Sequence, residues 1–134
     1  MAVQPSVPTA RTMVALIDSK TDVRRAVQLR LQARQFDVRA YASGWNMLAD
    51  EGQTVDCIVT RDRMVDIGGF ELLRRLRARG WQGPAILVTD IPGLEFARLA
   101  AHRGFAMVVD RPLVDDLIAN AVEVVTRTSP EIVA

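Results

Sequence analysis

The sequence predicts a single α/β domain built around a parallel β-sheet. Five short apolar runs alternate along the chain with five segments of helical periodicity, and turn residues separate them. The runs at 13–17 and 57–60 are almost wholly apolar, which is typical of strands covered on both faces. With 134 residues, the chain is long enough to bury the core of one such domain.

The first four elements follow directly from this alternation. Residues 13–17 form an apolar run that ends at Asp18, which predicts a buried strand. Segment 21–35 carries apolar residues at helical spacing, with arginines over much of the opposite side, which predicts an amphipathic helix. Segment 36–41 alternates apolar and polar residues, as a strand near a sheet edge does, and 44–50 is a short helix.

The middle of the chain repeats the same unit. Residues 57–60 predict a second buried strand, and 69–79 a helix that Gly80 ends. A glycine–proline break then leads into a strand at 85–88.

The last third predicts a helix at 94–103, closed by Gly104, a fifth strand at 106–109 and a final helix at 114–126. Strict alternation of strands and helices demands right-handed crossovers between parallel strands. At this length the natural arrangement is a flavodoxin-like three-layer sandwich with strand order 2-1-3-4-5. Its sites gather at the carboxyl ends of the strands.

Composition limits the classes of function. Seventeen basic against sixteen acidic side chains give a formal charge of +1, so no overall field attracts nucleic acid. No apolar run reaches the roughly 20 residues of a membrane span. The single cysteine, Cys57, lies in an apolar run and fits a reducing cytoplasm. We therefore expect a cytoplasmic protein with a loose arm at 1–11, a domain at 12–127 and a frayed tail at 128–134.

The segment around the third strand resembles the receiver domain of response regulators in two-component signalling. That family places its phosphoryl-accepting aspartate at the end of this strand, with a methionine three positions on and a glycine eight positions on. Met64 and Gly69 match both spacings, which puts Arg61 at the acceptor position. The resemblance extends over roughly residues 12–127.

The resemblance also implies a magnesium site made of two acidic residues after the first strand and the acceptor aspartate. Here these positions hold Asp18, Ser19 and Arg61. Magnesium prefers carboxylate oxygens, and a guanidinium stays charged near neutral pH. We therefore expect no metal, no cofactor and no catalytic residue in this pocket.

Three further positions complete the pocket that the resemblance implies. Thr89 matches the hydroxyl that bonds the phosphoryl group, and Arg111 replaces the lysine that clamps it. We expect the Arg111–Pro112 bond to be cis, as is usual in the family. Val108 stands at the aromatic switch position, where a valine has little leverage.

Asp62 is an alternative acceptor. Because side chains alternate along a strand, a one-residue step from Arg61 predicts that Asp62 points away from Asp18 and Thr89. The plainer expectation is a solvated loop carboxylate.

For Arg61 itself two outcomes are open. Its guanidinium either turns inward to pair with Asp18, where water is partly excluded, or swings out into solvent. We favour the inward pair, which would hold the pocket in one conformation without phosphate.

The resulting hypothesis is a receiver-only, atypical response regulator that acts by protein contact. Its expected partners are a histidine kinase or another response regulator, with a possible homodimer through the fourth helix, fifth strand and fifth helix. The alternatives are a working phosphotransfer protein that uses Asp62, or a small module that binds anions through Arg61 and Arg111.

Two surface features are weighed against partner binding. The helix at 69–79 carries Arg74, Arg75, Arg77 and Arg79, which we interpret as a solvated face rather than a nucleic-acid surface. Trp45 and Trp81 lie near connecting regions, where they contact a partner or cap the ends of the core.

Overall fold

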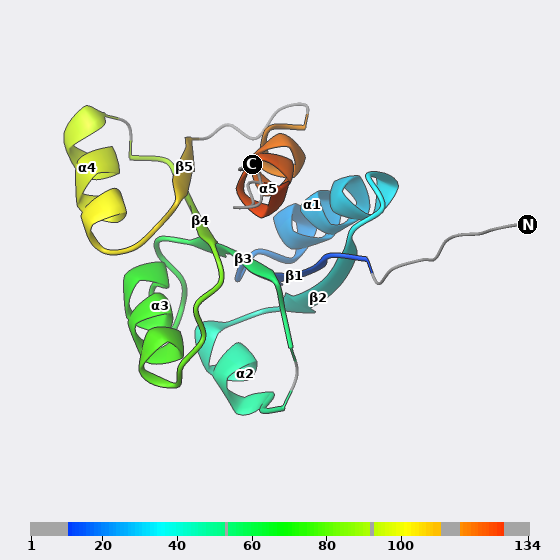
Figure 1. The fold of residues 1–134 in the computed structure, drawn as a ribbon, viewed down its shortest axis with the longest axis horizontal. Coiled ribbons are helices and arrows are strands. Elements are labelled where there is room, and N and C mark those ends of the chain that lie inside the picture. Colours follow the sequence, from blue (N-terminus) through cyan, green and yellow to red (C-terminus); the bar gives the residue numbers. More distant parts are fainter. Residues whose placement is uncertain (1–10, 53, 92, 111–115, 128–134) are drawn as a thin grey trace, which may run out of the picture.

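The computed structural model describes residues 11–52, 54–91, 93–110 and 116–127. Within them, strands and helices alternate in the predicted order, and Figure 1 shows the sheet running through the middle of the molecule. The elements, in chain order, are β1 Met13–Ile17, α1 Thr21–Ala33, β2 Asp37–Tyr41, α2 Gly44–Ala49, β3 Cys57–Arg61, α3 Gly69–Ala78, β4 Ala85–Thr89, α4 Leu94–His102, β5 Met107–Asp110 and α5 Leu117–Arg127.

The sheet has the predicted topology. All four strand pairings are parallel and the order is β2-β1-β3-β4-β5. β2 is an edge strand and is mostly exposed, whereas every residue of β3 and β4 is buried. The sequence patterns therefore predicted both the class of the fold and the burial of its central strands.

Helices cover both faces of the sheet, and each face has its own hydrophobic core. α1 and α5 pack on one face, with Leu31 and Val122 fully buried between helices and strands. α2, α3 and α4 pack on the other, where Leu72 is fully buried. Figure 1 shows α1 and α5 together on one side of the sheet and α2, α3 and α4 on the other.

Element boundaries differ from the predictions by one to three residues. The first helix stops at Ala33 instead of 35, because Gln35 adopts a left-handed backbone (φ 72°). No glycine marks that stop, so the sequence pattern does not predict it. The third strand is one residue longer than predicted, so that Arg61 is the last residue of β3. The expected arm and tail fall outside the described residues, apart from Arg11.

None of the described helices is long and apolar enough to cross a membrane. Cys57 is buried in β3 as predicted, and burial raises the pKa of its thiol to about 12.

Candidate functional site

The candidate site lies at the carboxyl edge of the sheet, where β1, β3 and β4 end beside one another. The register pairs Ile17 with Thr60 and Arg61 with Val88. Paired residues on parallel strands project to the same face, so the next step along β1 places Asp18 on the face of Arg61. The strand register thus brings together the two residues expected to form an internal pair.

Arg61 turns inward. The residue is only 8% exposed, and its Nη1 lies 4.0 Å from Oδ2 of Asp18 while its Nη2 lies 4.0 Å from Oδ2 of Asp90. These distances are longer than a charge-assisted hydrogen bond of about 2.8 Å. Within the described residues, Nε and Nη1 of Arg61 have no hydrogen-bond partner. The guanidinium is therefore held by charge and packing between two carboxylates.

Asp18 is also engaged by its own loop. Its Oδ1 accepts a hydrogen bond from the backbone N–H of Lys20 at 2.9 Å, and its backbone carbonyl accepts one from Nη1 of Arg24 at 2.8 Å. The residue is 5% exposed. One carboxylate oxygen thus fixes the start of α1, and the other faces Arg61.

The expectation that Asp62 points away from Thr89 was wrong. Oγ1 of Thr89 donates a hydrogen bond to Oδ2 of Asp62 at 2.9 Å, and both residues are buried. The reason is register: Arg61 pairs with Val88, so the next residues, Asp62 and Thr89, share the opposite face. Alternation along β3 does point Asp62 away from Arg61. The register with β4 then places Thr89 on the same face as Asp62.

The loop after β3 folds back tightly against the end of the strand. Gly69 donates its backbone N–H to the carbonyl of Asp62 at 3.1 Å, and a Cβ on Gly69 would lie 2.5 Å from the carbonyl oxygen of Arg61. Any larger residue at position 69 would push the strand end aside. This contact explains why a glycine eight residues after position 61 marks the register.

Two residues, Ser19 and Asp66, fix this loop through hydrogen bonds that the sequence pattern did not predict. Oγ of Ser19 accepts a hydrogen bond from the backbone N–H of Val65 at 3.2 Å. The carboxylate of Asp66 accepts hydrogen bonds from the backbone N–H groups of Gly44 at 3.3 Å and Trp45 at 2.8 Å, at the start of α2. Serine and aspartate are residues that bond nearby backbone in this way, but sequence does not show which backbone they reach.

These contacts change the pKa of the Asp66 carboxylate. Burial raises its pKa, but the backbone N–H groups of Trp45, Gly44, Ile67 and Asp66 itself together outweigh that effect and lower the pKa below its ordinary value. Asp66 is therefore held in the charged form that caps α2.

Comparison with known proteins agrees with this geometry. The family model of the response regulator receiver domain matches residues 14–123. This chain belongs to the response-regulator receiver family. Over 120 residues it is 33% identical to the transcriptional regulatory protein FixJ of Azorhizobium caulinodans, covering 88% of this chain and 56% of FixJ. It is 29% identical over 122 residues to the FixJ of Rhizobium meliloti, covering 90% of this chain and 58% of that protein.

This receiver thus spans a little over half the length of these curated relatives. Among solved structures, it superposes on the receiver domain of the Francisella response regulator 1452 with a TM-score of 0.81 at 17% identity, covering 87% of this chain and 98% of that one. That likeness shows the fold, and the family places the chain in two-component signalling, where receivers interact with histidine kinases and other regulators.

The carboxyl edge of this receiver is a poor fit to a magnesium ion. A hard cation needs several carboxylate oxygens, whereas Asp18 is paired here with a buried guanidinium and the Ser19 hydroxyl already serves the loop. Among the described residues, no group of three or more His, Cys, Asp or Glu side chains could hold a metal. Arg111 and the peptide bond to Pro112 lie outside the described residues.

Val108, at the position that the resemblance assigns to the switch, is half-buried in β5 beside Leu87 and packs against the core under α3 and α4.

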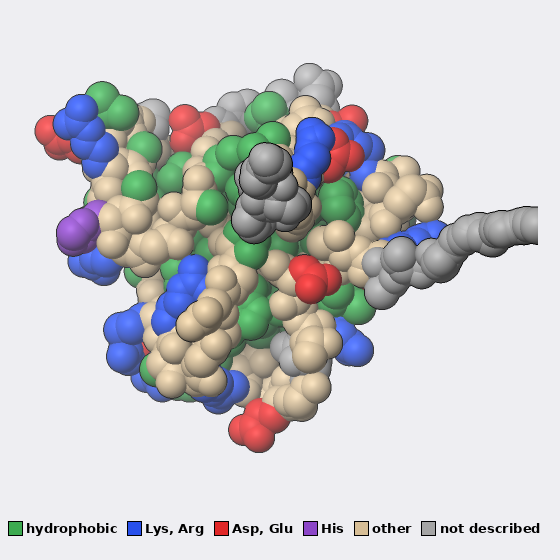
Figure 2. Space-filling model, in the orientation of Figure 1, with side chains coloured by type: hydrophobic (Ala, Val, Ile, Leu, Met, Phe, Trp, Pro, Cys, Tyr) green, Lys and Arg blue, Asp and Glu red, His purple; other side chains and the backbone are tan. Residues whose placement is uncertain are grey.

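The arginines of α3 gather on the same side of the molecule, and Figure 2 shows basic side chains over α3. Glu71 accepts hydrogen bonds from Arg74 at 2.9 and 2.6 Å and from Arg75 at 2.7 Å, and Arg77 donates to the carbonyls of Trp81 and Gly83. Arg74, Arg75 and Arg77 thus make hydrogen bonds within the protein.

Proposed function

We propose that this receiver signals by protein contact, without accepting a phosphoryl group at residue 61. The observation that carries the proposal is the buried Arg61 at the acceptor position, facing Asp18. A guanidinium does not deprotonate near neutral pH and offers no nucleophilic oxygen.

The surrounding groups support the same proposal, because each is engaged within the protein. A hydroxyl has one proton, and that of Thr89 goes to Asp62, while its oxygen accepts from the backbone N–H of Ile91 at 2.9 Å. Ser19 holds the loop at Val65. A phosphoryl group at residue 61 would find neither a charge-neutralising metal nor an available hydroxyl.

The partner in this proposal is a histidine kinase or another response regulator, and a homodimer through α4, β5 and α5 is part of it. Large apolar side chains stand out on these helices: Leu94 is 65% exposed, Leu99 40% and Leu117 43%. Exposed apolar residues at neighbouring helices are typical of interaction surfaces.

Incubation of the chain with acetyl phosphate, and separately with kinases from the same source, tests the proposal. We expect no acid-labile phosphate on the chain, with a receiver that has an aspartate at the acceptor position as the positive control. We also expect a kinase or regulator to bind the unphosphorylated chain in pull-down experiments, and the Arg61→Ala variant to bind differently. Labelling near one phosphate per chain would overturn the proposal.

One observation favours a second candidate, in which Asp62 is the acceptor. Its carboxylate lies beside the Thr89 hydroxyl, which is the hydroxyl that the family resemblance assigns to the phosphoryl group. Against this, Asp62 is only 9% exposed and its other oxygen accepts from the N–H of Arg63 at 3.0 Å. Mapping any label, with Asp62→Asn as the control variant, separates the two candidates.

A further inference from the structure

A concave feature lies at the opposite edge of the sheet from Arg61. A cavity of about 570 Å³ opens between α2 and α3, beside the residues that lead into β3 and β4. This volume falls within the roughly 300–1,000 Å³ of small-molecule sites. None of the pocket residues assigned by the receiver resemblance lines it.

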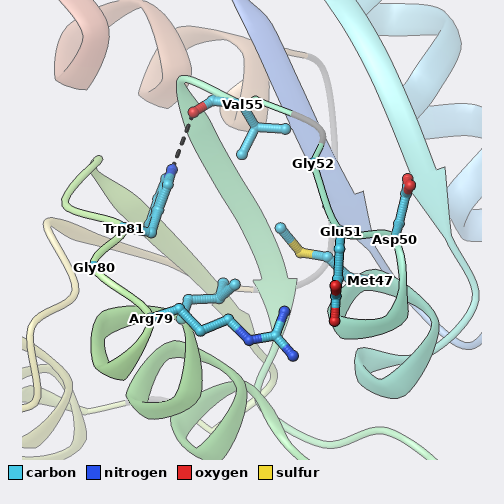
Figure 3. Close-up of a pocket in the computed structure, with 9 residues that line it drawn as sticks. Met47, Asp50, Glu51, Gly52, Val55, Arg79, Gly80 and Trp81 are labelled. Carbon is cyan, nitrogen blue, oxygen red and sulfur yellow. Dashed lines mark hydrogen bonds between the residues drawn. The ribbon is translucent and has the colours of Figure 1, made fainter.

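The wall of the cavity is mixed, with an apolar part beside a charged part. Met47 from α2 and Leu76 from α3 are buried there, and Val55 and Trp81 close it from the two connecting segments. Figure 3 shows the indole of Trp81 and the side chain of Met47 on facing sides of the cavity. A ligand with an apolar body would therefore be covered from several directions.

Two polar groups of the wall, on Trp81 and Arg79, are held by hydrogen bonds within the protein. Nε1 of Trp81 donates to the carbonyl of Val55 at 3.0 Å, and the guanidinium carbon of Arg77 lies 5.1 Å from the centre of the indole. Arg79, just after the end of α3, reaches toward α2, where its Nη1 donates to the carbonyl of Leu48 at 2.8 Å. The Trp81 and Arg79 side chains therefore have less freedom to lose on binding, which favours a ligand.

Charges of both signs meet at this cavity. Arg79 lines it together with Asp50 and Glu51, which follow the end of α2. Oδ2 of Asp50 accepts from the Tyr41 hydroxyl at 2.6 Å, and Glu51 is exposed. In the described part of the chain, no ion pair within 4.0 Å joins Arg79 to either carboxylate. The cation and the carboxylates thus remain able to meet a ligand.

We propose that this cavity binds a small zwitterion of the α-amino-acid class with an apolar side chain. The ligand carboxylate takes the open N–H groups of Arg79, and its ammonium group lies by Glu51 and Asp50. Its side chain packs on Met47, Leu76 and Trp81. A simple anion would meet the two carboxylates and a simple cation would meet Arg79, so only a ligand with both charges matches the wall.

Such a ligand would bridge α2 and α3. The Arg79–Leu48 contact already joins these helices, and the first residues of α2 are held by Asp66 of the loop after Arg61. Occupancy therefore stabilises the arrangement of helices next to that loop, which gives the domain an input that needs no phosphate. The binding site stands whether or not residue 61 or Asp62 is ever phosphorylated.

The test is a titration followed by the amide and indole N–H resonances of Trp81 in the Trp45→Phe variant, where Trp81 is the only tryptophan. The probes are L-leucine, N-acetyl-L-leucine without the ammonium group, L-leucinamide without the carboxylate, and glycine without the apolar body. We expect saturable shifts with L-leucine and affinities at least about tenfold weaker for the other three. Equal affinity for N-acetyl-L-leucine, or no saturable shift with L-leucine, would overturn the proposal.

Matched variants locate the ligand. Arg79→Gln should weaken L-leucine binding at least about tenfold, because the charge-assisted contact to the carboxylate is lost. Arg74→Gln removes an exposed arginine of α3 that contacts Glu71 outside the cavity, and it should leave binding unchanged. Arg79→Lys keeps the positive charge and should lose less affinity than Arg79→Gln. It also serves as the test variant if Arg79→Gln fails to fold. Equal effects of Arg79→Lys and Arg74→Gln would contradict the assigned site.

Discussion

Thr89 donates its hydroxyl proton to Asp62, on the opposite face of the sheet from Arg61. The same oxygen accepts the N–H of Ile91, so one buried hydroxyl ties the end of β3 to the segment that follows β4. The residue that the family resemblance assigns to phosphate sensing is thereby a structural link in this chain.

A double-mutant cycle on this pair should reveal coupling. Asp62→Ala leaves the fully buried Thr89 hydroxyl without its acceptor and should lower the free energy of unfolding by about 1–3 kcal/mol. Thr89→Val removes the hydroxyl and leaves the Ile91 N–H unpaired. Because the two share one hydrogen bond, the double variant should lose less stability than the sum, by about 1 kcal/mol. Urea unfolding measures all four proteins, and strict additivity would show that the contact carries no stability.

Magnesium binding should require two substitutions. Arg61→Asp alone restores one carboxylate, but Ser19 still occupies the second acidic position and bonds Val65. We expect the Ser19→Asp/Arg61→Asp variant to bind Mg²⁺ at least about tenfold more tightly than either single variant, since the ion prefers several carboxylate oxygens. Isothermal titration calorimetry gives the affinities. Tight binding by Arg61→Asp alone would mean that the original pocket is still competent apart from residue 61.

The fold could be read from the sequence because its signals are local and redundant. Buried parallel strands show as apolar runs, and helices show as amphipathic periods, as in 13–17 and 21–35. The helix end at Ala33 escaped prediction because Gln35, and not a glycine, takes the left-handed conformation just beyond it.

The site could be read only in part. The spacing of Met64 and Gly69 located Arg61, and its inward position follows from a strand end that is buried on both faces. The Asp62–Thr89 contact was missed because alternation along one strand does not reveal the register of the next. Likewise, the reach of Asp66 to the start of α2 depends on a loop path, which no local pattern encodes.

Asp66 should behave as a cap supplied from outside the helix. Asp66→Ala removes the acceptor for the N–H groups of Gly44 and Trp45 and should cost about 1 kcal/mol of unfolding free energy. Asp66→Asn keeps one acceptor oxygen and should cost less. Because the folded-state pKa is lowered, the contribution of Asp66 is present above its ordinary pKa and is lost as the pH falls below it. Acid titration of stability should therefore flatten in the alanine variant, and an unchanged acid profile would contradict the capping role.

Stability should also fall at alkaline pH. Burial raises the pKa of the Cys57 thiol to about 12, with the charge of Asp56 adding to the effect. Burial, together with the contact to Asp50, raises that of Tyr41 as well. A raised pKa means that the folded state keeps a proton which the unfolded chain releases. The stabilisation is therefore complete below the pKa of the unfolded chain and disappears as the pH rises through the pKa of the folded state.

For Cys57 this window runs from the ordinary value of 9.0 to about 12. Within it the unfolding free energy should fall by about 1.4 kcal/mol per pH unit for that proton. Cys57→Ala removes this proton, so its stability should decline less steeply with pH over the same range, whatever its absolute stability. Tyr41→Phe is the matched variant for the other group. The comparison is between slopes of stability against pH, so the cavity left by the alanine does not affect the result. Equal slopes in wild type and Cys57→Ala would show that the thiol ionises freely in the folded state.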